Sequence, residues 1–308
     1  MILSVTLNPA VDHALFVDGL KIGDTNRVVR NEIDAGGKGI NLSRVAVELG
    51  AMSVATGFLG GGTGAFIRKV MNLQGVLHDF VEVDGETRTN FSVEDGTGSP
   101  PTTFNEQGPT IQDDCWEKLQ NKVRHYATRS HWVALGGSLP RGIPPDAYRI
   151  LVEIALEAGA MVVLDADGEA MKHGIRARPN LIKPNMKEAG RLLGEPVETV
   201  DAALHAAAVL GEAHDIVIVS CGEKGAAMAC SEGVFRGTTP QVIAKSTIAS
   251  GDSLVGGFLA ALETGLDIET AFRWGLAAGA ATATTDGAEI ARRPVFEKLL
   301  PEARVEAV

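Results

Sequence analysis

The sequence predicts an α/β fold with a mostly parallel central sheet, helices on both of its faces, and a small antiparallel sheet outside it. Short apolar runs of strand length alternate with helical patterns along most of the chain, as in right-handed βαβ units. Residues 11–34 and 87–109 instead alternate apolar with polar residues and contain turn residues. That pattern favours antiparallel strands lying apart from the main sheet.

The expected elements follow one another regularly. The expected strands of the main sheet are 2–7, 53–58, 131–137, 160–166, 180–185 and 215–222. The expected helices between them are 39–49, 64–74, 112–127, 145–158, 187–193 and 199–213, and the chain after residue 250 is expected to be mostly helical over 252–265 and 268–285.

This order also predicts how the chain is divided. Residues 1–10, 35–86 and 110–308 are expected to form the α/β core, and residues 11–34 and 87–109 to form a β-sheet lid. Two insertions at one end of the core would pair over the active-site edge and exclude water during a transfer reaction. Two ordinary surface hairpins remain the alternative, because periodicity alone does not separate the two.

The composition limits the partners of the chain. Its 39 acidic and 28 basic residues give a net charge of −11, which argues against nucleic acid and anionic membranes. The three cysteines are odd in number and lack CxxC spacing, so a reducing cytoplasm without disulfides or a zinc knuckle is expected. The longest nearly uncharged run, SLVGGFLAAL, is too short to span a bilayer, and the N-terminal residues lack the features of a signal peptide.

The stretch IASGDSLVGG (248–257) places a carboxylate after a turn of small residues. If a helix begins here, Ala249, Ser250 and Gly251 present backbone N–H groups at its positive end, where phosphoryl oxygens are stabilised. Asp252 would accept the proton of an attacking hydroxyl. It would also serve as a helix N-cap, and the two roles are compatible.

The stretch AGGKGIN (35–41) has a related logic. Gly36 and Gly37 allow a ligand to approach the backbone closely. Lys38 and Asn41 offer donors to sugar hydroxyls or to a phosphate. Taken alone, the stretch is better explained as a plain loop before a helix, with Lys38 in solvent.

Two further turns follow expected strands. In IKPNMKEAG (182–190), Lys183, Asn185 and Glu188 project near a strand's carboxyl end, and Glu188 can hold Mg²⁺ through water. The alternative is a proline-marked turn with Glu188 in the first helical turn. SCGEKGA (220–226) is either a glycine turn that admits a nucleotide or a simple hairpin.

Two motifs point to other chemistry. GGGTGA (60–65) fits the dinucleotide-binding fingerprint between a strand and a helix, but it is the second βα turn rather than the first. GDSL (251–254) matches an esterase tetrapeptide whose histidine base lies downstream, whereas the last histidine here is His214. The glycines of the first motif are better explained by close helix packing, and the esterase interpretation is not favoured.

Segments with a characteristic order are spread along almost the whole chain: TLNPAVD (6–12), DTNRV (24–28), AGGKGIN (35–41), GETRTN (85–90), FNEQGP (104–109), GGSLPRGIP (136–144), LDADGEA (164–170), IKPNMKE (182–188), VSCGEKGA (219–226), GDSLVGGFL (251–259) and AAGAATAT (277–284). Together, these segments resemble the ribokinase-like (PfkB) carbohydrate kinases. The lysine of GGKG and the GSLP segment are similar to the hexose-phosphate kinase subgroup, which includes the 1-phosphofructokinases and tagatose-6-phosphate kinases.

The resemblance implies a three-layer α/β/α core with a β lid, and a role for each matching residue. For the sugar hydroxyls it implies Asp12, Gly37 and Asn41, and for the sugar's phosphate Lys38, Arg88 and Ser138, with Arg27 approaching from the lid. For Mg-ATP it implies Lys183, Asn185 and Glu188 (the magnesium side), and for the nucleotide pocket Ser220, Gly222 and Gly225. Asp252 would be the general base and residues 249–251 the anion hole.

The implied reaction is ATP-dependent phosphorylation of a ketohexose monophosphate to a bisphosphate. The resemblance also implies a homodimer that pairs through its lid. Tagatose 6-phosphate, fructose 1-phosphate and fructose 6-phosphate are the candidate acceptors, with NEQGP leaning towards tagatose. The sequence departs from the family at Ala249, where glycine is usual, because alanine tolerates positive φ poorly. Cys221 is expected to be a packed thiol. An NAD-type oxidoreductase and a catalytically silent sugar-phosphate-binding homologue remain alternatives.

Overall fold

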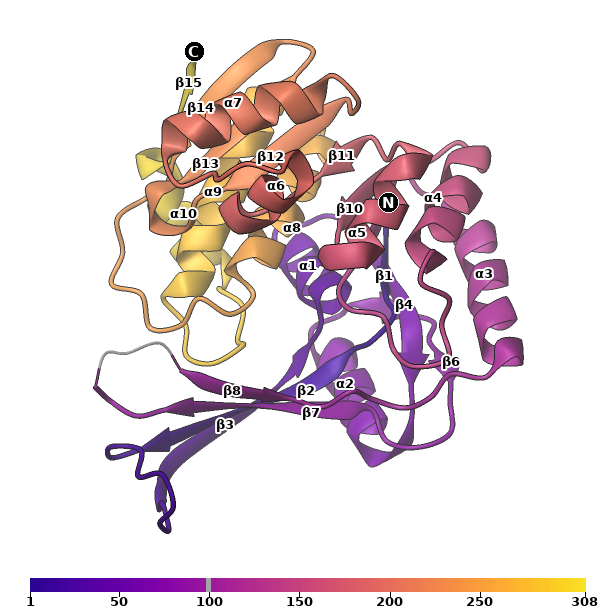
Figure 1. The fold of residues 1–308 in the computed structure, drawn as a ribbon, viewed down its shortest axis with the longest axis vertical. Coiled ribbons are helices and arrows are strands. Elements are labelled where there is room, and N and C mark those ends of the chain that lie inside the picture. The colour runs from indigo at the N-terminus through magenta and orange to yellow at the C-terminus, as the bar shows by residue number, and fades with distance from the viewer. Residues whose placement is uncertain (98–100) are drawn as a thin grey trace.

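The computed structural model describes residues 1–97 and 101–308 (Figure 1). Residues 98–100, within the expected lid segment 87–109, lie outside the described residues. The chain forms a large eleven-stranded sheet with helices on both faces and a separate four-stranded sheet.

The large sheet has the order β15-β14-β13-β12-β11-β10-β9-β1-β4-β5, with β6 also paired to β4. From β12 to β5 every neighbouring pair is parallel, as predicted. The strands are β1 (Ile2–Thr6), β4 (Ser53–Leu59), β5 (Leu77–His78), β6 (Val81–Glu82), β9 (Trp132–Gly136), β10 (Met161–Asp165), β11 (Leu181–Ile182), β12 (Ile216–Ser220), β13 (Ala226–Cys230), β14 (Gly233–Thr238) and β15 (Arg304–Ala307).

One edge of this sheet was not predicted. Strands β13, β14 and β15 extend it by antiparallel pairing beyond β12. The β13 sequence, AAMAC, is rich in alanine, and β15, RVEA, is short and mostly polar. Neither has the β-branched or alternating pattern by which a strand is recognised.

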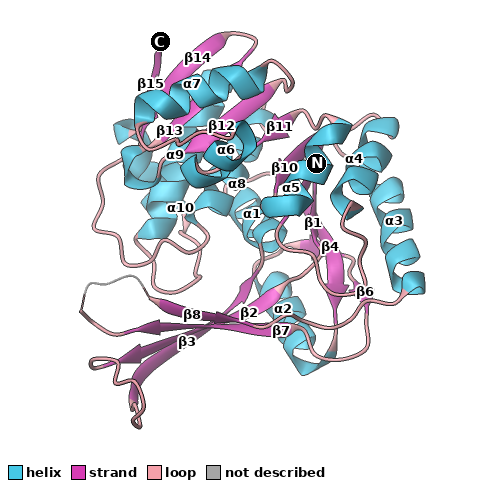
Figure 2. Cartoon of the chain, in the orientation of Figure 1, coloured by secondary structure: helices cyan, strands magenta, loops and turns pink. Residues whose placement is uncertain are grey.

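Helices cover both faces of the large sheet (Figure 2). One face is packed by α1 (Lys38–Glu48), α8 (Ser250–Glu263), α9 (Ile268–Ala283) and α10 (Arg293–Leu299), and the other by α3 (Asp113–Ala127), α4 (Ala147–Glu157), α5 (Gly168–Gly174), α6 (Met186–Leu193) and α7 (Val200–Gly211). Helix α2 (Gly61–Leu73) packs against the base of the small sheet, and single 3₁₀ turns form η1 (Ile175–Ala177), η2 (Gly222–Lys224) and η3 (Leu300–Glu302). The short helices α5 and α10 were not predicted.

The small sheet has the order β3-β2-β7-β8 and projects from one end of the core (Figure 1). Its strands are β2 (Ala10–Val17), β3 (Val28–Gly36), β7 (Arg88–Glu94) and β8 (Thr102–Asn105). Each hairpin is antiparallel, as predicted, but the middle pair β2–β7 is parallel. The two hairpins leave the core in the same direction, so their first strands run side by side with the same polarity.

The strand order creates the place where a ligand can bind. Strand β1 lies between β4 on one side and β9 on the other, so the connections diverge to opposite sides of it. In open α/β sheets, ligands bind beyond the carboxyl ends of the strands at such a switch point. Asn8, Ser138, Asp165 and Lys183 all stand at the carboxyl ends of these parallel strands or just beyond them.

Candidate active site

The amino end of α8 contains the turn expected to bind an anion. Ala249 is the N-cap residue and adopts a left-handed backbone conformation, with φ 61° and ψ −4°. Asp252 lies in the first helical turn, so the expectation that it also serves as the N-cap is wrong. No side chain caps this helix, although the Ser250 N–H makes a long 3.4 Å bond to the Thr247 carbonyl. A helix end without a side-chain cap leaves first-turn N–H groups for a ligand.

Asp252 has the properties of a general base. Its Oδ2 accepts a 2.9 Å hydrogen bond from Asn41 Nδ2 on α1. Burial raises the pKa of the Asp252 carboxyl to about 6, and the nearby Lys38 ammonium only partly offsets this. A carboxylate with a pKa close to the working pH combines a usable charged population with a strong affinity for the proton.

Beside Asp252 lies a buried cluster of three charges. Lys38 Nζ contacts Asp165 Oδ1 at 2.6 Å, and Lys183 Nζ contacts Asp165 Oδ2 at 3.1 Å. Burial alone would raise the pKa of Asp165, but the two ammonium groups outweigh it and hold that pKa below its usual range. Burial also opposes charge on Lys38, yet Asp165 raises the pKa of Lys38 above its ordinary value. Asp165 and Lys38 are therefore both charged at neutral pH.

Lys38 and Asp252 share one small cavity, which Asp165 also lines. The sequence prediction that the two remote glycine turns meet is confirmed by this shared cavity. Lys38 additionally faces a second cavity of about 510 Å³, lined by Ser138 and Glu188. Lys183 Nζ lies 3.4 Å from the point where a side chain on Gly251 would begin, so this lysine stands at the helix end.

Asp12 on β2 lies where the small sheet joins the core. Its Oδ1 accepts a 2.9 Å hydrogen bond from Asn90 Nδ2 on β7. Burial raises the pKa of Asp12, and the Asn90 donor and Arg88 partly counteract this. A Cβ on Gly36 would lie 1.9 Å from Asp12 Oδ2, so only glycine leaves room for this carboxyl. Gly37, with φ 117°, is the N-cap of α1.

Arg88 and Ser138 meet through Asn8. The Arg88 Nη2 and Nε donate to the Asn8 carbonyl at 3.0 and 3.2 Å, and Nη1 donates to the Glu106 carbonyl at 3.1 Å. The Asn8 Nδ2 donates to Ser138 Oγ at 3.2 Å. A guanidinium and a hydroxyl are thus held on the two sides of one buried asparagine.

Arg27 does not join these residues within one chain. It lies in the exposed loop 18–27 between β2 and β3, at the end of the hairpin far from the core. Seven residue steps separate Ala10, at the core, from Val17 at the loop, which is about 23 Å along a strand. The expected approach of Arg27 to the phosphates is therefore not met in the single chain.

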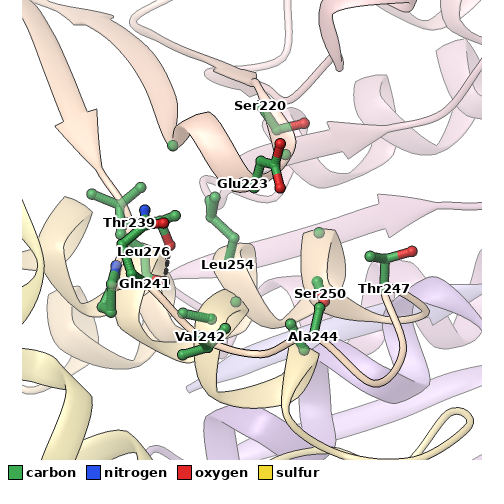
Figure 3. A pocket seen from close by; sticks show the side chains of 17 residues that line it. Ser220, Glu223, Thr239, Gln241, Val242, Ala244, Thr247, Ser250, Leu254 and Leu276 are labelled. Carbon is green, nitrogen blue, oxygen red and sulfur yellow. Dashed lines mark hydrogen bonds between the residues drawn. The ribbon is translucent and has the colours of Figure 1, made fainter. Parts of the chain in front are cut away.

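A cavity of about 440 Å³ lies on the other side of the α8 end (Figure 3). Its walls include the apolar side chains of Leu254 and Leu276, and the predicted Ser220, Gly222 and Gly225 line it. The full lining is Ser220, Gly222, Glu223, Gly225, Thr239, Pro240, Gln241, Val242, Ala244, Thr247, Ser250, Gly251, Leu254, Leu276, Gly279, Ala280 and Ala283. Its size and its apolar walls with polar edges suit a nucleotide. The turn at Gly222 is both a hairpin connection and a cavity wall, so the two interpretations hold together.

Asn185 and Glu188 do not line that cavity; they form a capping box at the start of α6. Glu188 N donates to Asn185 Oδ1 at 3.0 Å, and Asn185 N donates to Glu188 Oε2 at 2.8 Å. In the described part of the chain, no three His, Cys, Asp or Glu residues gather into a metal-binding group. The single carboxylate of Glu188 nonetheless suits Mg²⁺, because this ion keeps several waters and binds one or two carboxylates plus substrate phosphates.

The two competing motifs have structural roles. The Glu86 carboxylate accepts hydrogen bonds from the N–H groups of Gly62 (3.1 Å) and Thr63 (2.9 Å) at the start of α2. A carboxylate thus already occupies the helix end that a dinucleotide pyrophosphate would need. Ser253 of GDSL is fully buried and accepts a 2.8 Å hydrogen bond from Thr282, which does not suit an esterase nucleophile.

Sequence reasoning missed several residues of this site. Asp165 ends the apolar strand MVVLD, and a charged residue at that position was the available signal. Asn8 and Asn90 lie inside quoted motifs but have no signature of their own. In the described residues, four buried side-chain atoms have no hydrogen-bond partner, namely Asn8 Oδ1, Asn41 Oδ1, Asn90 Oδ1 and Ser250 Oγ. Unpartnered buried polar atoms that gather around one site indicate a polar ligand.

The remaining expectations concern cysteines and membranes. Cys221 is buried, and burial raises its pKa to about 11, so it is the packed thiol that was expected. Cys115, Cys221 and Cys230 are all free thiols. Within residues 1–97 and 101–308, no helix is long and apolar enough to cross a membrane.

The family model for the pfkB family carbohydrate kinases matches residues 5–294. The chain belongs to this family. It is 35% identical over 306 residues to a 1-phosphofructokinase of Bacillus subtilis, covering 99% of both chains. It superposes on phosphofructokinase-2 from Escherichia coli in complex with substrates and products with a TM-score of 0.91 and 26% identity, covering 98% of both chains. It also shares the fold of an Arabidopsis thaliana ribokinase (TM-score 0.76, 23% identity, 97% of this chain and 98% of that one).

The expected family, the ribokinase-like fold and the carbohydrate kinase class are thereby confirmed. This PfkB kinase retains the carboxylate, the lysines and the glycine turns on which the resemblance depended.

Proposed function

We propose that this PfkB kinase transfers the γ-phosphoryl group of ATP to a free hydroxyl of a ketohexose monophosphate, producing a bisphosphate and ADP. The supporting observation is the position of the α8 end. Ser250 and Gly251 face the nucleotide-sized cavity, while the next residue, Asp252, shares the other cavity with Lys38. An acceptor hydroxyl beside Asp252 and a γ-phosphate beside Gly251 would therefore be neighbours.

In this proposal Asp252 orients the acceptor hydroxyl and takes its proton as the oxygen attacks the γ-phosphorus. The bond from the γ-phosphorus to the bridging oxygen breaks, and that oxygen leaves with ADP. The Lys183 ammonium and the N–H groups at Gly251 stabilise the charge on the transferred group. Mg²⁺, held through water by Glu188, would neutralise part of the phosphate charge when bound.

The sugar-phosphate side is proposed to use the residues around Asn8 and Asp12. Arg88, Lys38 and Ser138 would bind the phosphate already on the sugar, since a guanidinium grips phosphate in a bidentate manner. Asp12 and Asn41, with the Gly37 backbone, would bind sugar hydroxyls. The unpartnered Asn41 Oδ1 is an acceptor suited to such a hydroxyl.

Among the candidate acceptors we propose fructose 1-phosphate, with tagatose 6-phosphate and fructose 6-phosphate as alternatives. Support comes from the curated relatives at 35% and 33% identity, both called 1-phosphofructokinase. This choice differs from the tagatose preference suggested by NEQGP. Phosphorylation of fructose 1-phosphate would yield fructose bisphosphate.

A catalytically silent homologue was kept as an alternative because of Ala249. The turn supports activity instead: Ala249 itself adopts the left-handed conformation, and Asp252 stays bonded to Asn41. The substitution therefore costs conformational energy without removing the base from the site.

We also propose that two copies pair through their small sheets. Among the residues with exposed apolar side chains are Ile22, Val29, Ile33 and Phe104, all of which belong to this sheet or its loops. A second copy would cover them and would bring its own hairpin loop, with Arg27, towards the partner's site. Light scattering would test this, and a strictly monomeric active enzyme would contradict it.

The proposed activity is tested by ADP release coupled to a reporter reaction over a panel of sugar phosphates with Mg-ATP. We expect ADP formation with a ketohexose monophosphate, with fructose 1-phosphate giving the highest kcat/KM. Turnover should be lost in Asp252→Asn while ATP binding persists. Binding of sugar phosphate without any ADP would support the silent homologue, and a nicotinamide absorbance change with the panel would support the oxidoreductase.

A further inference from the structure

Asp165 is the central member of the buried charge cluster, and the proposed mechanism gives it no role. Its side chain is 8% exposed, and its two oxygens are divided between two lysines from different parts of the chain. Lys38 begins α1 and is 33% exposed towards the acceptor cavity, while Lys183 follows β11 and is 5% exposed beside the α8 end. One carboxylate thus connects the acceptor side to the anion-binding side.

Stability alone does not account for this cluster. Asp165 is the last residue of β10. The three residues before it, Val162, Val163 and Leu164, are apolar and almost completely buried. Removing charges from water is expensive, and apolar replacements of buried ion clusters are often neutral or stabilising. A carboxylate here therefore points to a need for charge at this position.

The need lies in the relation of the cluster to Asp252. Asp252 lines the same small cavity as Lys38 and Asp165, yet in the described part of the chain it forms no ion pair. Its carboxylate accepts a 2.9 Å hydrogen bond from the neutral amide of Asn41. Both ammonium groups that would otherwise neutralise it are bound to Asp165 instead.

We propose that Asp165 is a positioning residue that holds the ammonium groups of Lys38 and Lys183 away from Asp252, leaving the base free to accept the substrate's proton. Without Asp165, two buried lysines would remain beside one carboxylate. An ion pair between Asp252 and Lys38 would then weaken the base and withdraw a cation from the sugar phosphate. The inference rests on the proposed function, because it takes Asp252 as the base.

The effect on proton affinity has a definite direction. The charged side chains with the largest influence on Asp252 are Lys38 from α1, Asp165 from β10 and Lys183 from the segment after β11. Asp165 raises the pKa of Asp252, and the two lysines lower it. Removing the charge of Asp165 both deletes the raising influence and frees the lysines to approach, so both changes lower the pKa of Asp252.

The test is the pH dependence of kcat/KM in Asp165→Asn. The acid limb should move to lower pH by about one to three units, the usual effect of an opposite charge in contact, and kcat should fall. The substrate's phosphate also titrates near pH 6, but it is the same in every variant and cannot cause the displacement. Asp201→Asn, which removes an exposed carboxylate paired with Arg236, is the matched control and should not move the limb.

Two further measurements keep the test decisive. The double variant Asp165→Asn/Lys183→Met removes one charge of each sign, so it folds without an additional unpaired charge, and its Asp252 pKa should also fall. Lys183→Met alone should raise that pKa. NMR titration of ¹³C-labelled aspartate carboxyls reads these values without turnover, with the Asp252 signal assigned by its loss in Asp252→Asn.

The outcomes separate the inference from the proposed function. Unchanged Asp252 titration in both Asp165 variants, with near-UV circular dichroism like that of the parent, would overturn the inference alone. Persistent turnover in Asp252→Asn would overturn the assignment of the base and the inference with it. A downward shift in both variants, together with an inactive Asp252→Asn, supports both.

Discussion

The substitution Asp252→Asn is expected to inactivate the enzyme and also to stabilise its fold at neutral pH. The carboxyl is held in the native protein with a pKa of about 6, against 3.8 for the free group. A carboxyl whose pKa is raised on folding binds its proton more tightly in the folded state. Folding therefore loses stability as the pH rises from about 4 to about 6, and the cost is complete above that window.

The magnitude follows from the size of the shift. Roughly two pKa units at 1.36 kcal/mol each amount to about 3 kcal/mol of destabilisation at pH 7. Asparagine retains an oxygen that accepts the Asn41 Nδ2 hydrogen bond but carries no charge, so most of this cost should disappear. For a chain of this size that corresponds to roughly 5 °C or more in Tm.

The assay is thermal unfolding of the parent and the variant between pH 4 and pH 8, beside the coupled ADP assay. The gain in Tm should be full at pH 7 to 8 and should shrink to a small remainder near pH 4, where the parent carboxyl is protonated in the folded state and about half protonated in the unfolded chain. Asp201→Asn serves as a control without this pH dependence. A variant that is less stable at pH 7, or a gain that does not change with pH, would refute the reasoning.

Two other changes have clear expected outcomes. Ala249→Gly should raise the free energy of unfolding by about 1 kcal/mol, because a non-glycine residue in the left-handed region costs about 1–2 kcal/mol. The kcat of this variant should be at least as high as that of the parent. A lower Tm would contradict the strain inferred from φ 61° at Ala249. Arg88→Ala should raise KM for the sugar phosphate about tenfold or more, equivalent to about 1.4 kcal/mol of lost phosphate binding. KM for ATP should hardly change, so equal rises in both constants would place the effect of Arg88 on the fold rather than on the phosphate.

Much of the architecture could be predicted because it is encoded locally. Apolar strand-length runs such as ILSVTL and DIVIVSCG appear as β1 and β12, and the helical patterns between them appear as helices within a few residues of the expected ends. The failures share a cause. The alanine-rich β13 and the polar β15 are strands only because neighbours pair with them, and the parallel β2–β7 contact depends on the direction in which two remote hairpins leave the core.

The site shows the same division. Asp252 was proposed as a base from its small-residue turn at a helix start, whereas Lys38 and the nucleotide-side glycines were selected by the family resemblance, because their own turns are at least equally compatible with plain loops. The role of Glu86 at the start of α2, the distance of Arg27 from the core and the division of Asp165 between two lysines have no local signature.

The sequence by itself determined the periodicity of the strands and helices, the order of the glycine turns and the family to which they belong. Only the tertiary structure decided which charges meet, because segments more than a hundred residues apart converge at the carboxyl ends of the parallel strands. Coulomb interaction and desolvation depend on distances through space and on the exclusion of water. Neither quantity exists until the sheet has brought Lys38, Asp165, Lys183 and Asp252 to one place.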